Sequence, residues 1–251
     1  MPPHPIRQIS GGESLLRIVN CTRDIRKVTG NAIGLRQVSE NQNAGRGFHY
    51  RKKPTVNCWW TMTSTDTVYA GALLFSGSTI LILAMMIAEA IYPGYSIAQN
   101  YISDLGVGST APIFNTAIIL YGAGVIAAVY LLHRDCTIPS PALIVLGLSG
   151  AGAAGVWFFP ETFPAPHYVA SATAFLGGGV AVLLIARSLR GPFRYLSALL
   201  GCLALIALMF FALDQHAGIG PGGMERLVAY PLILCSAGFG CWLMAQAEGQ
   251  E

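Results

Sequence analysis

Six long apolar segments, separated by short polar stretches, fill most of the chain between residues 70 and 245. They cover residues 70–91, 113–132, 142–159, 168–186, 195–213 and 227–245. At 1.5 Å per residue, a helix of about 20 apolar residues crosses the hydrocarbon core of a bilayer. Continuous apolar runs of this length, without alternation between polar and apolar positions, indicate helices rather than the strands of a barrel. The pattern predicts an all-α polytopic membrane protein with six transmembrane helices.

Composition supports this class. Of the 251 residues, 53% are hydrophobic and only 11% are charged, whereas soluble domains carry about 25% charged residues. Proline and glycine stand at nearly every boundary between an apolar segment and its neighbouring loop, where helices are expected to begin or end.

The first 61 residues have a different character. They hold ten of the 15 Lys and Arg residues but only three of the 12 Asp and Glu residues, and they contain no apolar run long enough for a span. We interpret them as a disordered extension upstream of a true start at Met62; a basic cytoplasmic tail and an organellar transit peptide are the alternatives. The remaining residues, 62–251, form the predicted membrane domain and are slightly acidic. The overall basic balance is therefore no evidence for nucleic-acid binding.

The distribution of arginine predicts an orientation. Arg134 lies in the second loop and Arg187, Arg190 and Arg194 lie in the fourth, whereas the odd-numbered loops contain only Arg226. Because cytoplasmic loops are enriched in Lys and Arg, both ends of the six-helix domain are expected in the cytoplasm. The first, third and fifth loops then share the extracytoplasmic face of a cell membrane.

The polar residues that call for an explanation gather on that predicted outer face. The longest polar stretch is residues 92–115, which follows the first apolar segment. The end of the first apolar segment, this stretch and the third and fifth loops supply the candidate site residues: Glu89, Ser103, Asp104, Asn115, Glu161, His167, Asp214, His216, Glu225 and Arg226. Ionisable groups that converge at one face of a membrane protein are typical of a binding or catalytic site, but also of a water-facing rim.

Several of these residues have a structural alternative. Ser103 and Asp104 suit a helix-capping turn as well as a site. His167 is expected just before the fourth helix, as an interfacial side chain or a proton- or metal-handling group. His216 lies in a glycine-rich stretch that also suits an unstructured connector. Arg226 opposes the positive-inside trend, and so we expect it to hold a carboxylate or a lipid phosphate.

Small residues four apart predict a close helix pair. Gly147, Ala151 and Gly155 form one such strip in the third segment, and Ala170, Ala174 and Gly178 form another in the fourth. Small residues let helix backbones approach in lipid, so these two helices are expected to pack as a tight antiparallel pair.

The sequences YPGYS, ISDLG and IFN around the first loop, FPETFPAPH before the fourth helix and GGMERL at the sixth resemble those of the domain-of-unknown-function 998 family of prokaryotic six-helix membrane proteins. The resemblance covers about residues 70–245 and implies the same fold, without an established activity. A looser similarity to the Frag1, DRAM and Sfk1 group favours an association with lipids.

Two functions follow as hypotheses. In the first, the protein binds or handles a membrane lipid or small solute at its extracytoplasmic face, through Asp104, Asn115, His167, Glu225 and Arg226. In the second, it is a membrane-embedded hydrolase acting on a lipid, with zinc held by Asp104, His167 and His216 and with Ser103 nearby. The paired-histidine helix motif of such enzymes is missing, and no other cofactor is evident. The six cysteines include no CxxC pair and are expected to be free thiols.

Overall fold

A computed structural model describes residues 65–135 and 138–248, so the predictions for residues 1–61 lie outside the described part. The described chain contains six long helices and no strand. They are α2 (Thr65–Ile91), α3 (Ala111–Arg134), α4 (Ser140–Phe158), α5 (Pro164–Ser188), α6 (Pro192–Ala212) and α7 (Gly220–Glu248). Each is long and apolar enough to cross a membrane. The prediction of an all-α multi-pass membrane protein is confirmed.

The helices extend beyond the apolar segments, and this moves several predicted positions. Proline is tolerated in the first turn of a helix because its missing N–H has no partner there. Accordingly α5 begins at Pro164 and α7 at Gly220, in stretches we expected to be loops. His167 therefore lies inside the first turn of α5, and Glu225 and Arg226 lie in the second turn of α7.

The stretch 92–115 is also more ordered than a loop. Two short 3₁₀ turns, η2 (Ser103–Gly106) and η3 (Gly108–Thr110), precede α3, and Asn115 belongs to α3 itself.

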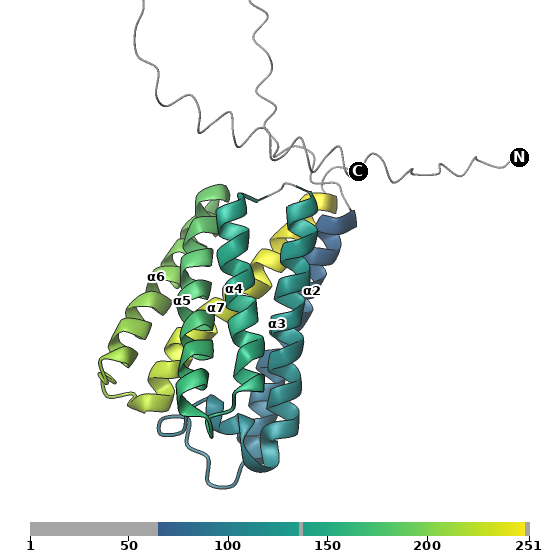
Figure 1. The fold of residues 1–251 in the computed structure, drawn as a ribbon. Helices are drawn as coiled ribbons and strands as arrows, with labels where there is room; N and C mark the ends of the chain where they lie inside the picture. The colour runs from purple at the N-terminus through teal and green to yellow at the C-terminus, as the bar shows by residue number, and fades with distance from the viewer. Residues whose placement is uncertain (1–64, 136–137, 249–251) are drawn as a thin grey trace, which may run out of the picture. The chain divides into compact units, whose positions relative to one another are not determined.

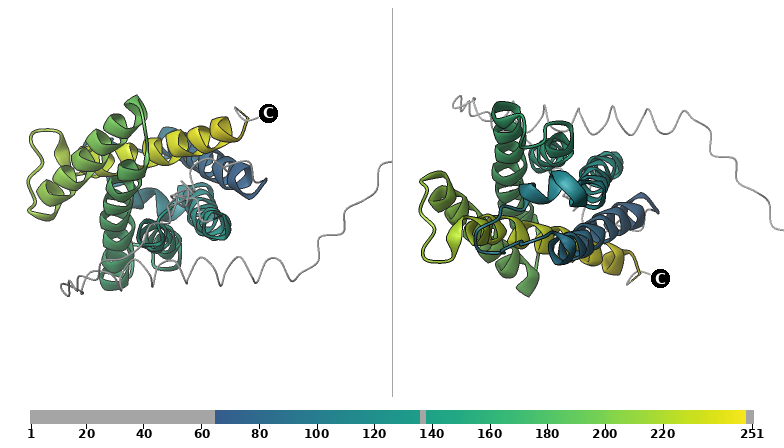
Figure 2. Two further views of the ribbon diagram at one scale, coloured as in Figure 1. Left: turned by 90° about the horizontal axis from the view of Figure 1, so that it is seen from above. Right: turned by 90° about the horizontal axis from the view of Figure 1, so that it is seen from below.

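Each helix packs against the next along the chain, and α7 returns to α2. Views along and across the bundle show α7 crossing the other helices obliquely, with α6 at its outer side (Figures 1 and 2). Close crossings occur where glycines face each other. A Cβ placed on Gly71 of α2 would lie 2.7 Å from the carbonyl oxygen of Gly240 in α7. Because α5 also contacts α7, the helices α2–α5 and α7 form a ring around the interior, and α6 packs outside it against α5 and α7.

The predicted α4–α5 pair exists, but its contact residues on α4 differ from the expected strip. Ala151 is exposed and Gly147 faces α3 near Val129, so only Gly155 of that strip faces α5, where an added Cβ would lie 3.2 Å from the Cβ of Ala170. The closest approach is at Gly152, where an added Cβ would lie 2.5 Å from the backbone nitrogen of Ala174. On α5 the expected residues do make this contact. One face of α4 thus packs against α3 and another packs against α5.

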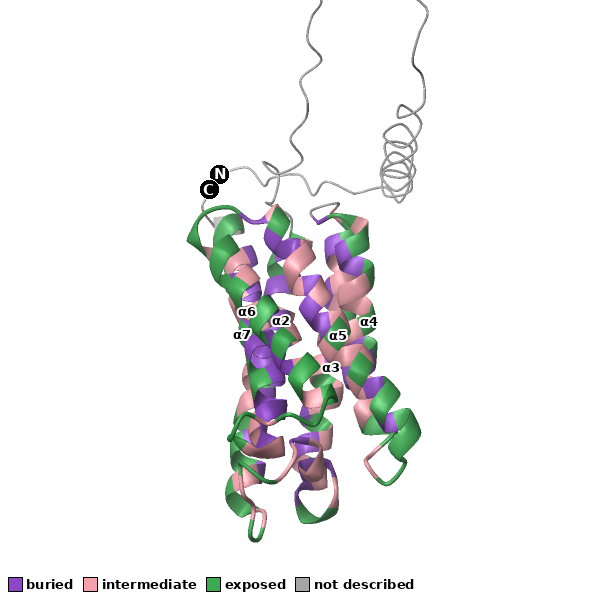
Figure 3. Cartoon of the chain, turned by 90° about the vertical axis from the view of Figure 1, so that its left-hand side faces the viewer, coloured by how far each residue is buried: buried purple, intermediate pink, exposed green. Residues whose placement is uncertain are grey.

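The outer surface is apolar, as a membrane-embedded ring requires. Large hydrophobic side chains remain exposed on every helix, for example Leu148, Val169 and Leu199. Figure 3 shows exposed residues along the outward faces of the helices and buried residues between them.

Candidate functional site

One end of the bundle gathers most of the candidate residues, and we call it the polar end. It comprises the stretch 92–110, the turn 159–163 between α4 and α5, and the loop 213–219 before α7 (lower end in Figure 1). The structure brings the three predicted outer loops to this one end because each follows a helix that runs in the same direction.

Arg226 is the best-connected side chain of the polar end. Its Nε and Nη2 atoms donate to Oε1 of Glu89 in α2, at 3.2 and 2.7 Å, and Nη2 also donates to the hydroxyl of Tyr95. Nη1 donates to the carbonyl oxygens of Ile97, Asn100 and Gly222 at 2.8–3.0 Å. The side chains of Arg226 and Glu89 are only 5% and 13% exposed. Every N–H of the guanidinium is therefore engaged, and Arg226 ties α2, the 92–110 stretch and α7 together.

Tyr95 completes this cluster. Its hydroxyl donates to the carbonyl oxygen of Tyr101 at 2.8 Å while accepting from Arg226, whose guanidinium also lies over the tyrosine ring. Burial raises the pKa of Tyr95 to about 12, so the phenol keeps its proton at neutral pH.

The glycine-rich start of α7 is a packed surface, not an open connector. The backbone N–H of Gly222 donates to the carbonyl oxygen of Ala98 at 3.0 Å. A Cβ on Gly220 would collide with Ala98, and one on Gly222 would collide with the carbonyl of Asn100. These glycines allow the 92–110 stretch to dock on α7, which places Arg226 beneath it.

Asp104 lies next to this cluster without touching Arg226. Its Oδ2 accepts from Nδ2 of Asn100 and from the backbone N–H of Tyr101, at 2.9 and 3.0 Å. Asn100 is thus shared, because its carbonyl oxygen binds Arg226. The carboxylate thus stabilises a turn, which is the alternative to a site role that the sequence suggested for Asp104.

Ser103, beside Asp104, reaches across to the turn between α4 and α5. Its hydroxyl donates to Oε1 of Glu161 at 2.6 Å. Burial raises the pKa of Glu161, and the neighbouring Asp104 carboxyl raises it further, whereas the hydrogen bond from Ser103 lowers it. Glu161 and Asp104 therefore form an acidic pair behind Ser103.

Glu225 points inward from α7, unlike its neighbour Arg226. It is only 6% exposed, and its Oε2 accepts from the backbone N–H of Ile102 at 2.5 Å. Its other oxygen, Oε1, makes no hydrogen bond within the described part of the chain, and it is not among the fully buried atoms without a partner, which are Oγ of Ser78 and of Ser236. Because the residue lines the interior cavity, Oε1 is available to a molecule bound there.

His167 is buried and hydrogen-bonded at both ring nitrogens. Nδ1 lies 2.8 Å from the carbonyl oxygen of Phe159 and can only donate to it, which leaves Nε2 of the neutral ring as an acceptor for the hydroxyl of Ser171, 3.3 Å away. His167 thereby joins the end of α4 to α5. Ser171 was not singled out from the sequence.

The remaining candidates are placed apart from each other. Nδ2 of Asn115 donates to the carbonyl oxygen of Gly106 and so anchors η2 to α3. His216 pairs with the exposed Asp214 of its own loop, at 3.4 Å. Within residues 65–135 and 138–248 no three His, Cys, Asp or Glu side chains are grouped so that they could hold a metal ion. Asp104, His167 and His216 are accordingly not brought together as zinc ligands.

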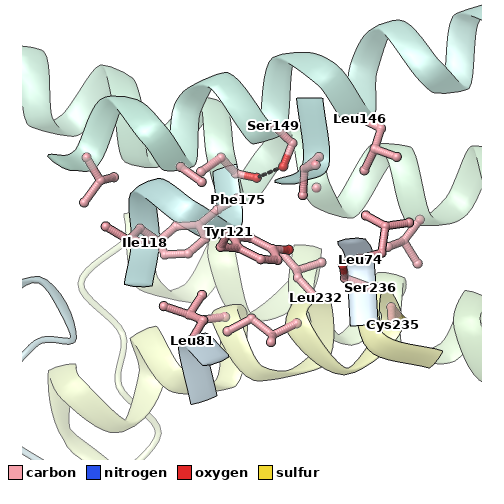
Figure 4. Close-up of a pocket in the computed structure, with 18 of the residues that line it drawn as sticks. Leu74, Leu81, Ile118, Tyr121, Leu146, Ser149, Phe175, Leu232, Cys235 and Ser236 are labelled. Atoms are coloured by element: carbon pink, nitrogen blue, oxygen red, sulfur yellow. Dashed lines mark hydrogen bonds between the residues drawn. The ribbon is translucent and has the colours of Figure 1, made fainter. Parts of the chain in front are cut away.

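The interior of the ring contains a mainly apolar cavity with a volume of about 110 Å³. This volume is below the usual range for ligand pockets, about 300–1,000 Å³, so the space is narrow. All six helices contribute to its wall, for example through Leu74, Ile118, Leu146, Phe175, Ser197 and Leu232. In Figure 4 the labelled side chains converge from several helices. The hydroxyl of Ser149 in α4 donates to the backbone carbonyl oxygen of Ala174 in α5.

The cavity is elongated and reaches the polar end. Along α5 its wall includes both Ser171 and Ile185, which are about 21 Å apart at 1.5 Å per residue. At the polar end it is bounded by Ser103 and Glu225. One end of an apolar tunnel therefore meets the acidic residues described above.

Comparison with known proteins supports the resemblance noted from the sequence. No curated protein and no solved structure matches the chain. The model of the family described as "Protein of unknown function (DUF998)" matches residues 75–242, from the third turn of α2 through most of α7. This match covers more than half of the chain, and the protein belongs to the DUF998 family of membrane proteins of unknown function.

Proposed function

We propose that this protein binds an amphipathic, lipid-like molecule, with the apolar tail inside the helix ring and the head at the polar end. The observation that carries the proposal is the cavity itself. Its wall is mainly apolar, and its lining extends for about 21 Å along α5, about two thirds of the roughly 30 Å thickness of a hydrocarbon core. Water is a poor occupant of apolar cavities, whereas an alkyl chain would restore the missing contacts of the wall.

The proposal also changes the role expected for Arg226. All of its donors are engaged within the protein, so it supports the site by fixing the 92–110 stretch rather than by binding a lipid phosphate. From the arginine distribution we further propose that the polar end faces away from the cytoplasm.

Two alanines on α4 provide a matched test. Ala153 lines the cavity, whereas Ala151, two residues earlier, is exposed on the outside. Protein purified in mild detergent is extracted, and the bound small molecules are identified and counted by mass spectrometry. Wild type and Ala151→Phe should retain an amphiphile in near-stoichiometric amount, and Ala153→Phe should lose it. Equal retention by the two variants, or no molecule in excess of background, would overturn the proposal.

A further inference from the structure

The polar groups that face the cavity at its polar end are hydrogen-bond acceptors. The hydroxyl of Ser103 already donates to Glu161, and that of Ser171 donates to the neutral ring of His167. Each serine therefore presents oxygen lone pairs, not a proton, to the cavity that it lines. The third polar group is Glu225, whose Oε1 has no partner in the described part of the chain.

Among the described residues, the polar end offers no free N–H donor to such acceptors. Arg226 is the only Arg or Lys of the polar end as far as the structure describes it, and its N–H groups are all engaged with Glu89, Tyr95 and three carbonyl oxygens. The N–H nearest to Glu225, that of Ile102, is bound to Oε2. A molecule that places its head here meets the oxygens of Glu225, Ser103 and Ser171 and no free N–H group in the described part of the chain.

The charges around the end of the cavity also favour a positively charged head. Glu161 and Asp104 lie beside Ser103, and the one arginine of the described polar end, Arg226, is paired with Glu89. A phosphate or carboxylate head at this position would face like charge and would find no donor. A head with several N–H groups and a positive charge satisfies both conditions.

We infer that the amphiphile carries an ammonium head, which donates to Oε1 of Glu225 and to the hydroxyl oxygens of Ser103 and Ser171, while its alkyl chain fills the cavity. This inference rests on the proposed function and names its ligand class, a long-chain primary amine. The buried carboxyl of Glu225 is the selective group, and the two serines complete the set of acceptors.

The test uses photoactivatable probes that share one diazirine-bearing alkyl chain and differ only in the head: ammonium, trimethylammonium, hydroxyl or carboxylate. Each is applied to the full chain in nanodiscs of zwitterionic lipid, and labelling of cavity peptides is counted above the level in Ala153→Phe. Labelling by the ammonium probe should exceed that by the carboxylate probe at least about tenfold, since a hydrogen bond to a charged group contributes about 1.5–3 kcal/mol and about 1.4 kcal/mol is tenfold. The trimethylammonium probe, which has the charge without N–H donors, should fall between them.

Two variants assign the preference to its residues. Glu225→Gln should bring the ratio of ammonium to carboxylate labelling close to one, and Ser171→Ala, which keeps the carboxyl, should lower it partly. The second variant keeps the inference testable if the first fails to fold. Equal labelling by all heads in the wild-type protein would overturn the ammonium head while leaving the cavity as a binding site. Absence of labelling by every probe above the Ala153→Phe level would overturn the proposed function itself.

Discussion

Removing the guanidinium of Arg226 should destabilise the protein far more than removing an exposed arginine. The change Arg226→Gln leaves the Glu89 carboxylate, only 13% exposed, without its partner, and also strips a hydrogen bond from three backbone carbonyls. Breaking a buried ion pair by removing one partner costs about 3–5 kcal/mol. The carbonyl groups that lose a donor move the expected value toward the upper end of that range.

The chain contains a matched control. Arg134 forms an ion pair with Asp66 at 3.4 Å, but the two side chains are 48% and 26% exposed. Such a pair contributes about 0–1 kcal/mol, so Arg134→Gln should have a small effect. Free energies of unfolding are measured by titrating SDS into mixed micelles and following helical circular dichroism. If Arg226→Gln costs no more than Arg134→Gln, the buried cluster does not hold the polar end together.

A double-mutant cycle isolates the pair itself. Glu89→Gln alone strands the guanidinium, whereas Glu89→Gln combined with Arg226→Gln removes both charges. The double variant should therefore lose less free energy than the sum of the single changes, by about 0.5–3 kcal/mol. Strict additivity would contradict the contact between Arg226 and Glu89.

Three further outcomes are expected. Burial raises the pKa of Glu161 in the folded protein above its ordinary value of 4.5, so its contribution to stability is fully present below pH 4.5 and is lost as the pH rises through the folded pKa. Glu161→Gln should reduce this loss of stability with rising pH in unfolding titrations. An unchanged dependence of the unfolding free energy on pH would refute the expectation. Gly218→Ala and Gly220→Ala both place a side chain at a positive φ, but only the Cβ at position 220 would collide with Ala98. Gly218→Ala should therefore lower the free energy of unfolding by roughly 1–2 kcal/mol, and Gly220→Ala should lower it distinctly more. Equal losses would contradict the docking of the 92–110 stretch on α7. Single cysteines at Gly108 and Gly218 should react with an impermeant thiol reagent in intact cells, whereas one at Ser140 should not; the reverse pattern would invert the proposed orientation.

The helices could be predicted from the sequence because hydropathy alone requires them, but their ends could not. The turns at Pro164 and Gly220 look like loops by composition, yet both are first turns of helices. Proline and glycine break a helix interior but are compatible with its start. The spacing of small residues also could not predict which residues of α4 contact α5. Gly147, Ala151 and Gly152 are all small, and the packing of the neighbouring helices decides which of them faces α5.

The site was predictable in part. The anomalous position of Arg226 correctly indicated a partner, with Glu89 among the candidates, but the two are 137 residues apart and nothing local selects this carboxylate over the others. The cavity gave no signal at all, because side chains such as Phe175 and Leu232 that line it are of the same types as those that face lipid. Ser171 was overlooked since a single serine in an apolar helix usually bonds to its own backbone, as Thr173 does.

The occupancy of the cavity is the central claim, and cryo-electron microscopy tests it most directly. The full chain, purified in nanodiscs and enlarged by a rigid antibody fragment, should show an elongated density inside the helix ring, between Phe175 and Leu232, with its wider end beside Glu225. The same map of Ala153→Phe should lack that density. A wild-type interior closed by its own side chains, or density found only on the outer faces of the helices, would contradict the account.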